Sequence, residues 1–352
     1  MSGKWKKENV VLVDHESTDS DEYLSGLKDA TNLDWGVISS VANQGRGTVM
    51  GSIARYAKYF WFPFIAFLHR NRFKNVIGWQ AFYGINLAFF EKLFRVKKTH
   101  TLTIQHFIYK KKSGFLGFVY DRYIHYAVDS RYVDLIVTCS RGYANELNRE
   151  FGMPEGAVRF APFGVTDFQS KGILPSRGDY VLSLGRSNRD WSWLIGEASY
   201  SPMKFVIACD TLHCDDVPPN VEIRNDVNGV EALKLLAGCF CSVLPIENPS
   251  LSSGETVLLQ SMCLGKPLLV TAPSGLATDY IDPGSNGYAI DKGASGELAQ
   301  VLSDLNADNF KYETISRNSR TAYLDNYSLF AHGRYVGKEI NFLVNRIEGS
   351  VQ

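Results

Sequence analysis

Small polar residues stand in front of a predicted helix at residues 250–256, in the sequence SLSSGET. Ser253, Gly254 and Thr256 leave room for a close backbone approach, and Ser252 or Ser253 is a good N-cap for the apolar helix that follows. The first turn of a helix offers unpaired N–H groups and the positive end of its dipole, which suit an anion such as a diphosphate. An ordinary helix-and-strand unit of a parallel sheet has the same pattern, so both interpretations stay open.

Polar residues that could bind a substrate or transfer a proton follow two apolar strands. Asp14 and Glu16 come after a strand at residues 10–13, and His106 comes after a strand at residues 101–104. In an open parallel sheet the carboxyl ends of the strands face the ligand crevice. Asp14 and Glu16 are therefore candidate acceptor ligands or general bases, and His106 is a candidate substrate contact. A solvated turn and a structural histidine are the alternative interpretations.

Bulky aromatic residues alternate with Lys and Arg in two segments, residues 54–74 and 79–98. Residues 51–112 contain twelve Lys and Arg against one acid, whereas residues 201–308 contain five against fourteen. Rings at headgroup level and cations facing phosphate are typical of an anionic membrane surface. The competing partner for such a patch is nucleic acid, but no nucleic-acid-binding motif accompanies it, so we expect none to bind. The residues predicted to face the membrane or the acceptor are Lys58, Trp61, Arg70, Arg72, Lys110, Lys111 and Lys112.

The composition is that of a globular protein with room for two domains. The chain has 352 residues, of which 45% are hydrophobic and 21% charged, and its net charge is zero. Its six cysteines include no C-x-x-C pair, which favours buried thiols in a reducing compartment over a zinc site. The first residues lack the apolar core of a signal peptide, and the longest nearly apolar run, residues 59–68, is too short to span a bilayer. We therefore expect a cytoplasmic protein.

Buried strands alternate with helical segments in the second half of the sequence. The strands are expected at residues 180–184, 204–210, 240–245 and 268–271. This alternation predicts a doubly wound parallel sheet of the α/β class. A stretch rich in turn-forming residues, 170–178, separates this half from the first.

The segment that follows Ser253 resembles the donor-sugar motif of GT-B glycosyltransferases, especially the large retaining group 1 type that includes family 4. The pattern of that group is E-x7-E followed by A-M-x-x-G-x-P-V-V, and residues 260–262, Gly265 and residues 267–269 match its second half. Ser252 and Gln260 stand where the pattern has its two acids.

A variant branch of bacterial polysaccharide enzymes, which reads S-G-Q-T-x-L-L, is similar to residues 253–259, S-G-E-T-V-L-L. Because Glu255 stands at the Gln of that branch, the resemblance implies a donor-site role for it. Gln260 takes the place of the acid that contacts the nucleotide ribose.

The resemblance also implies roles for residues outside this motif. Gly185 would let the backbone approach the diphosphate, and Arg186 and Arg189 would supply its two cations, a task suited to the forked donors of arginine. His106 would touch the donor sugar, and no metal is expected. The implied donor and diphosphate site comprises Gly185, Arg186, Arg189, Glu247, Ser253, Gly254, Thr256 and Gln260, and the implied catalytic set comprises His106, Glu255 and Asp14.

The same resemblance implies the GT-B fold, in which two Rossmann-like doubly wound domains face a cleft and a C-terminal helix crosses back to the first domain. We expect an N-terminal, membrane-facing domain at residues 1–170 and a nucleotide-sugar-binding domain at residues 171–327. Residues 328–352 would form the returning helix.

The function that these features favour is a metal-independent glycosyltransferase of the hexosyltransferase type. It would move a sugar from a nucleotide diphosphate donor to a lipid-linked glycan in bacterial surface polysaccharide synthesis, with retention, while bound peripherally to the inner face of the plasma membrane. One alternative is a nucleotide-sugar epimerase, which needs no basic aromatic face. The other is a non-catalytic, membrane-associated GT-B scaffold, which would explain why Ser252 and Gln260 replace both motif acids.

Overall fold

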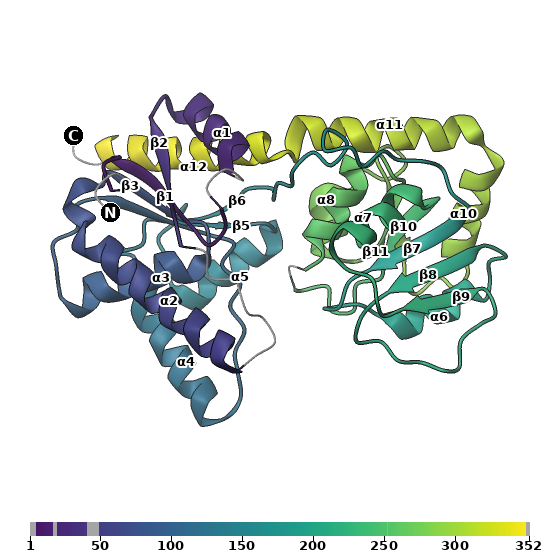
Figure 1. The fold of residues 1–352 in the computed structure, drawn as a ribbon, viewed down its shortest axis with the longest axis horizontal. Coiled ribbons are helices and arrows are strands. Elements are labelled where there is room, and N and C mark those ends of the chain that lie inside the picture. Colours follow the sequence, from purple (N-terminus) through teal and green to yellow (C-terminus); the bar gives the residue numbers. More distant parts are fainter. Residues whose placement is uncertain (1–4, 17–19, 41–48, 252, 350–352) are drawn as a thin grey trace. The chain divides into compact units, whose positions relative to one another are not determined.

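The structure is a computed structural model that describes residues 5–16, 20–40, 49–251 and 253–349. The chain packs as two compact units, the first made of Met1–Pro162 with Leu329–Gln352 and the second of Phe163–Ser328. Each unit contains a six-stranded parallel sheet with helices on both faces (Figure 1). The predicted α/β class with doubly wound parallel sheets is therefore confirmed.

The sheet of the first unit has the strand order β2-β1-β3-β4-β5-β6. Every residue of β1 is buried, as expected for a parallel strand that is covered on both faces. Because all six strands run the same way, the residues that follow them lie along one edge of the sheet. The strands are β1 (Asn9–Val13), β2 (Trp35–Ser39), β3 (Asn75–Gly78), β4 (Thr101–Gln105), β5 (Leu135–Thr138) and β6 (Val158–Phe160).

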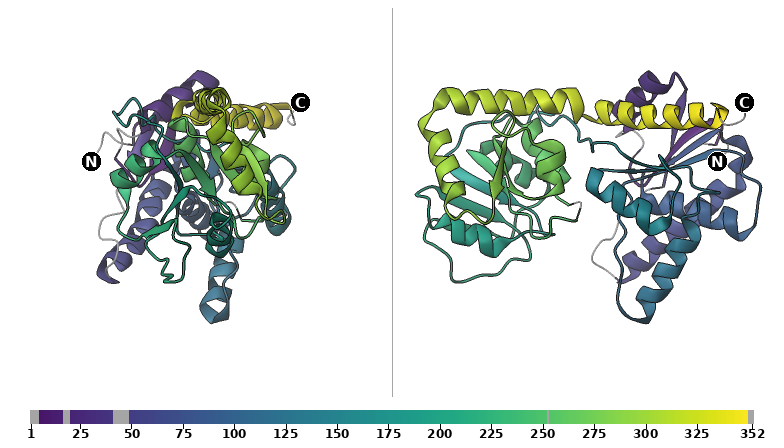
Figure 2. Two further views of the ribbon diagram at one scale, coloured as in Figure 1. Left: turned by 90° about the vertical axis from the view of Figure 1, so that its right-hand side faces the viewer. Right: turned by 180° about the vertical axis from the view of Figure 1, so that it is seen from behind.

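Helices cover both faces of this sheet (Figure 2). One face packs against α1 (Asp21–Thr31) and α12 (Leu329–Gly349), and the other against α2 (Val49–Leu68), α3 (Ala81–Leu93), α4 (Gly114–Ala127) and α5 (Arg141–Phe151). The α1 and α12 backbones touch, because a Cβ at Gly26 would lie 2.0 Å from the carbonyl oxygen of Phe330 and one at Gly333 would lie 2.2 Å from that of Tyr23. Only glycine fits at these two positions, so the close pairing of the two helices is encoded in the sequence.

The sheet of the second unit has the order β12-β11-β10-β7-β8-β9. Its strands are β7 (Tyr180–Leu184), β8 (Lys204–Ala208), β9 (Val221–Arg224), β10 (Cys241–Leu244), β11 (Leu268–Ala272) and β12 (Tyr288–Asp291). One face packs against α6 (Trp191–Ala198) and α10 (Glu297–Ala307), and the other against α7 (Gly229–Gly238), α8 (Glu255–Cys263) and α9 (Gly275–Tyr280). The long helix α11 (Asn309–Asn326) contributes side chains to both cores.

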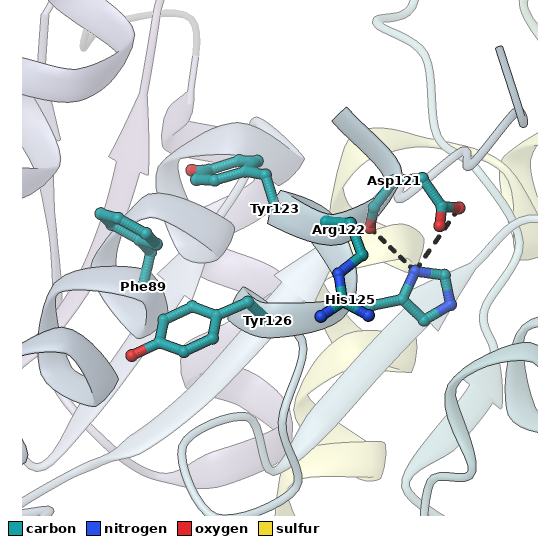
Figure 3. Close-up of a pocket in the computed structure, with 6 residues that line it drawn as sticks. All are labelled: Phe89, Asp121, Arg122, Tyr123, His125 and Tyr126. Atoms are coloured by element: carbon teal, nitrogen blue, oxygen red, sulfur yellow. Dashed lines mark hydrogen bonds and ion pairs between the residues drawn. The ribbon is translucent and has the colours of Figure 1, made fainter. Parts of the chain in front are cut away.

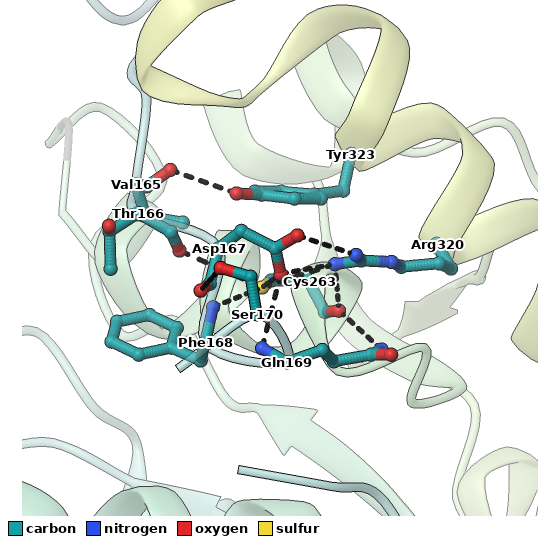
Figure 4. A network of polar contacts seen from close by, with 9 residues as sticks. All are labelled: Val165, Thr166, Asp167, Phe168, Gln169, Ser170, Cys263, Arg320 and Tyr323. Atoms are coloured by element: carbon teal, nitrogen blue, oxygen red, sulfur yellow. Dashed lines mark hydrogen bonds and ion pairs between the residues drawn. The ribbon is translucent and has the colours of Figure 1, made fainter. Parts of the chain in front are cut away.

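A partly buried polar network holds the C-terminal end of α8 in place (Figure 4). Arg320 of α11 makes a bidentate ion pair with Asp167, with N–O distances of 2.9 and 2.8 Å, and it also donates to the carbonyl of Cys263 at 2.6 Å. The amide of Gln169 donates to the same carbonyl at 2.9 Å. These bonds satisfy the carbonyl of Cys263, the last residue of α8, and they hold the C-terminal end of the helix.

No helix within the described residues is both long and apolar enough to cross a bilayer. Among the six cysteines Cys214 is exposed and the other five are buried, and none of them forms a disulfide.

Candidate functional site

Arg189 lies between two glycine turns of the second unit. Gly185, which follows β7, has a φ of 129°, and Gly254, which precedes α8, has a φ of 111°. Glycine adopts such positive φ values without the steric cost that other residues meet. A Cβ at position 185 would lie 2.9 Å from Nη2 of Arg189, and one at position 254 would lie 3.3 Å from both Nη1 and Nη2. The two glycines therefore create the space that the guanidinium fills.

The positive charge of Arg189 is largely shielded from solvent, since the residue is only 7% exposed. Its guanidinium donates to the carbonyl oxygens of Leu184 at 3.2 Å, Ser187 at 3.1 Å and Asn188 at 3.4 Å. These acceptors carry no net charge. Burial lowers the pKa of Arg189 to about 10, and the negative charge of Glu255 acts in the opposite direction. An anion beside the guanidinium would remove this electrostatic cost.

The N-terminus of α8 is next to this guanidinium. Gly254 is the N-cap residue, and no side chain in the described part of the chain caps the helix there. The predicted N-cap at Ser252 or Ser253 is therefore wrong, because the left-handed backbone at Gly254 delays the first helical residue to Glu255; Ser252 itself lies outside the described residues. The N–H groups of the first turn point out of the helix end, and together with the helix dipole they add to the positive potential of Arg189.

Contacts between two loops fix the position of Arg189. The side chain of Asn188, which has a φ of 57°, donates to the carbonyl of Asn248 at 3.0 Å and accepts from the Asn248 N–H at 2.7 Å. Asp190 caps α6 through the N–H of Trp193 and pairs with Lys292. The loop after β7 is thus joined to the loop after β10, and Arg189 is turned inward.

The other predicted donor-site residues occupy different environments. Arg186 is exposed, and its guanidinium lies 3.3 Å from the carboxylate of Asp210. Glu247 is also exposed, and its N–H donates to the carbonyl of Asn188 at 3.4 Å. Ser253 is half-buried, Thr256 is exposed in the first turn of α8, and Gln260 is half-buried one turn further along. Gly185, Arg189, Gly254 and the start of α8 are therefore the predicted residues that the fold brings together.

In the first unit, Asp14 and His106 lie at the carboxyl edge of the sheet, where they follow β1 and β4. Asp14 is buried and accepts a hydrogen bond from the Gln80 amide at 2.8 Å. His106 has a φ of 53°, and its Nδ1 lies 3.2 Å from Sγ of Cys139. Burial, together with the neighbouring His332, lowers the pKa of His106 well below its usual 6.5, so the ring is neutral at pH 7.

Two aromatic residues that the sequence did not suggest surround His106. The ring of Trp79 meets the His106 ring edge to face, with 5.6 Å between the ring centres. The ring of His332 stacks on the His106 ring, with 5.2 Å between the ring centres. Trp79 follows β3, which marks it as a strand-end residue; His332 belongs to α12 and carries no local signal of a site.

The protonation of His332 follows from its contacts. Its Nδ1 lies 2.6 Å from the carbonyl oxygen of Pro162, so this nitrogen carries the proton. Its Nε2 accepts from the amide of Gln105, whose oxygen accepts from the Tyr23 hydroxyl at 2.8 Å. Burial lowers the pKa of His332 to about 4, so this ring is also neutral at pH 7.

The predicted membrane-facing residues lie in several environments. Lys58, Trp61 and Arg72 are exposed, whereas Arg70 is half-buried and donates to the carbonyl of Phe67 at 3.0 Å. Many rings of α2 and α3 belong to the core or pack against it: Phe62 and Phe67 are buried, and Phe64, Phe89 and Phe90 are half-buried. Lys110, Lys111 and Lys112 are exposed just before α4.

A hollow of about 600 Å³ opens beside α4 (Figure 3). It is lined by Phe89, Asp121, Arg122, Tyr123, His125 and Tyr126. Asp121, His125 and Glu150 offer ligand atoms within 4.8 Å of one another. Lys111 pairs with Glu150 at 3.0 Å, and Tyr109 donates to Asp121, so neighbouring protein groups already engage these carboxylates.

No family model and no curated protein matches the sequence. Solved structures do match the fold. Anabaena HepE in complex with UDP has a TM-score of 0.63 and 14% identity, with 95% of this chain and 100% of HepE covered. Sucrose-phosphate synthase from Thermosynechococcus elongatus has a TM-score of 0.63 and 13% identity, with 96% of this chain and 100% of the synthase covered. WaaG, a glycosyltransferase involved in lipopolysaccharide biosynthesis, has a TM-score of 0.54 and 15% identity, with 93% of this chain and 98% of WaaG covered. The chain therefore has the GT-B fold that the sequence predicted.

Proposed function

We propose that this protein is a glycosyltransferase that takes a sugar from a nucleotide diphosphate donor. The observation that carries the proposal is the position of Arg189, buried beside Gly254 and the N-terminus of α8. Arg189 and the helix N-terminus both contribute positive potential, and the single charge of Glu255 offsets the burial of Arg189 only in part, so a ligand with two or more negative charges would be stabilised there. The departing diphosphate of a nucleotide sugar is such a ligand.

In this mechanism the second unit stabilises the charge that develops on the leaving diphosphate. Arg189 and the first N–H groups of α8 donate to its oxygens, and Gly185 and Gly254 allow the close approach. Arg186, exposed at the same loop, would add a second cation by exchanging Asp210 for phosphate. We propose Glu255, Glu247, Ser253, Thr256 and Gln260 as further donor contacts, with no metal required.

We also propose roles for residues of the first unit. His106, neutral at pH 7, would hydrogen-bond the donor sugar, and buried Asp14 would bind the acceptor hydroxyl or accept its proton. The acceptor would be a lipid-linked glycan of a surface polysaccharide, with retention of configuration. The exposed cations before α4 support the proposed peripheral site on the inner membrane surface, and WaaG, which has the same fold, is involved in lipopolysaccharide biosynthesis.

Titration calorimetry without added metal tests the donor proposal. We expect one nucleoside diphosphate among UDP, GDP, dTDP and ADP to bind, and the matching monophosphate to bind at least about tenfold more weakly, because it lacks one phosphate group that Arg189 would meet. NMR of the product from the corresponding nucleotide sugar then distinguishes retention from inversion. Absence of binding by every diphosphate would contradict the transferase and favour the scaffold. Interconversion of the free nucleotide sugar would favour the epimerase.

A further inference from the structure

The first turns of α4 expose a group of large apolar side chains. Phe115, Leu116, Phe118 and Val119 are 78%, 82%, 62% and 47% exposed. The inward residue between them is Gly117, where a Cβ would lie 2.1 Å from the carbonyl oxygen of Lys112. We call these four exposed residues the α4 tip. A contiguous apolar group of this kind on a globular unit marks a surface that another phase or molecule covers.

The α4 tip stands away from the core of its own unit. Figure 1 shows α4 extending beyond the sheet that it covers, and the exposures identify the projecting end as its N-terminal end. The C-terminal half of the helix, in contrast, buries Ile124 and Ala127 in the core. The C-terminal half of α4 is therefore packed into the core, whereas its N-terminal end is exposed to solvent.

Cations border the α4 tip on both sides. Lys110 and Lys112 precede it and are exposed, and the ammonium of Lys112 lies 4.4 Å from the centre of the Tyr120 ring. Arg122, also exposed, follows Phe115 by seven residues, which places it on the same helix face about 10 Å further along the axis. An apolar face at a membrane surface is buried about 5–10 Å into the headgroup and acyl boundary, which is close to this separation.

We propose that the α4 tip inserts into the boundary region of an anionic membrane while Lys110, Lys112 and Arg122 meet lipid phosphates. The inference deepens the membrane partner suggested under Proposed function. It assigns insertion to α4, where four neighbouring apolar side chains are exposed together, whereas α2 exposes Tyr56, Phe60 and Trp61 but packs its other rings in or against the core. A lipid surface fits better than a protein groove for two reasons. The apolar end is short, and the exposed charged side chains that border it, Lys110, Lys112 and Arg122, are all positive.

Vesicle flotation of matched variants tests the α4 tip. Phe115→Ser with Leu116→Ser removes two exposed side chains, and Phe310→Ser with Leu174→Ser removes a matched pair, 78% and 72% exposed, in the second unit. On mixed phosphatidylcholine–phosphatidylglycerol vesicles we expect the first variant to lose at least about tenfold in partition coefficient and the second to match the wild type. Lys110→Glu with Lys112→Glu should weaken binding at low salt, and less so at high salt.

A fluorescent label measures insertion directly. Cys214 is the exposed cysteine, so Leu116→Cys in a Cys214→Ser background places an environment-sensitive dye at the α4 tip. We expect brominated lipids to quench this dye. Unchanged flotation of the tip variant, or a dye that stays in water on bound vesicles, would overturn the inference. Loss of self-association in sedimentation, with vesicle binding intact, would assign the tip to a second copy instead.

The transferase proposal is measured separately, by nucleoside diphosphate binding in vesicle-free buffer. If no diphosphate binds but flotation depends on the α4 tip, the transferase fails and the insertion stands. If a diphosphate binds and flotation ignores the tip, the reverse holds.

Discussion

A Cβ atom at position 254 would lie 3.3 Å from both terminal nitrogens of Arg189, although the two residues are far apart in the sequence. The glycine at the start of α8 and the arginine after β7 therefore form one structural feature. Because the missing side chain of Gly254 leaves the space that the Arg189 guanidinium occupies, substitution of either residue should disturb the proposed diphosphate site.

Replacement of Arg189 by alanine should lower transfer by about 10²-fold or more, the scale expected when a charge-stabilising group is lost. Arg186→Ala should cost less, because Arg186 is exposed and already shared with Asp210. The measurements are initial rates of transfer, and calorimetry with the diphosphate, the monophosphate and the nucleoside. The loss of binding affinity should be largest for the diphosphate. An equal loss of affinity for all three ligands would indicate a folding defect. Arg317→Ala, an exposed arginine of α11, is the control.

Gly254→Ala should destabilise the second unit and weaken diphosphate binding. A φ of 111° costs a non-glycine residue about 1–3 kcal/mol, and the new Cβ would lie 2.9 Å from Cδ1 of Leu276. Gly196→Ala in α6 is the matched control, because nothing lies within 4 Å of its Cβ position. Chemical denaturation and calorimetry of both variants check the prediction. Equal behaviour of the two variants would show that the turn at Gly254 tolerates a side chain.

Glu91 should make the first unit less stable as the pH rises. Burial raises its pKa from 4.5 to about 7, so its favourable contribution is fully present below pH 4.5 and is lost as the pH rises through 7. The neighbour His100, whose Nε2 lies 3.4 Å from Oε1 of Glu91, has a pKa lowered to about 4 by burial, so its contribution is lost in the opposite direction, as the pH falls from 6.5 through 4. The two effects nearly cancel between pH 4.5 and 6.5 in the unmodified protein.

The variant Glu91→Gln separates these two effects. Relative to the unmodified protein its unfolding free energy should rise by on the order of 3 kcal/mol between pH 4.5 and 7. Denaturant titrations at several pH values measure this difference. Glu222→Gln, whose side chain is 42% exposed beside Lys204, should change stability by only about 0.5 kcal/mol. A difference for Glu91→Gln that does not vary with pH would contradict the raised pKa.

His106→Ala should lower kcat for transfer by about tenfold or more, if the neutral imidazole hydrogen-bonds the donor sugar as proposed. Because burial and His332 keep the pKa of His106 well below 6.5, its loss should not change the shape of the pH–rate profile between pH 6 and 8. Initial rates across that range are the measurement. Disappearance of a limb near pH 6.5 in the variant would show that the ring titrates there after all.

Much of the fold followed from local patterns in the sequence. Apolar strands such as residues 180–184 and 268–272 alternate with helices, and this periodicity depends on neighbours in the chain. Helix α4 was not predicted, because its two glycines and its apolar residues on more than one face obscure the helical period. The N-cap of α8 was misplaced because serine is the commoner cap, whereas close packing against Arg189 requires glycine.

The resemblance to GT-B glycosyltransferases pointed to Gly185 and two nearby arginines for a diphosphate site, and the small polar residues around Gly254 indicated an anion-binding helix start from the sequence itself. Which arginine is buried depends on the contact between Asn188 and Asn248, which are sixty residues apart and meet only when β7 and β10 pair. The stacking of His332 on His106 likewise requires α12 to return to the first sheet. Such contacts depend on long-range packing, whose energetic balance no short stretch of sequence contains.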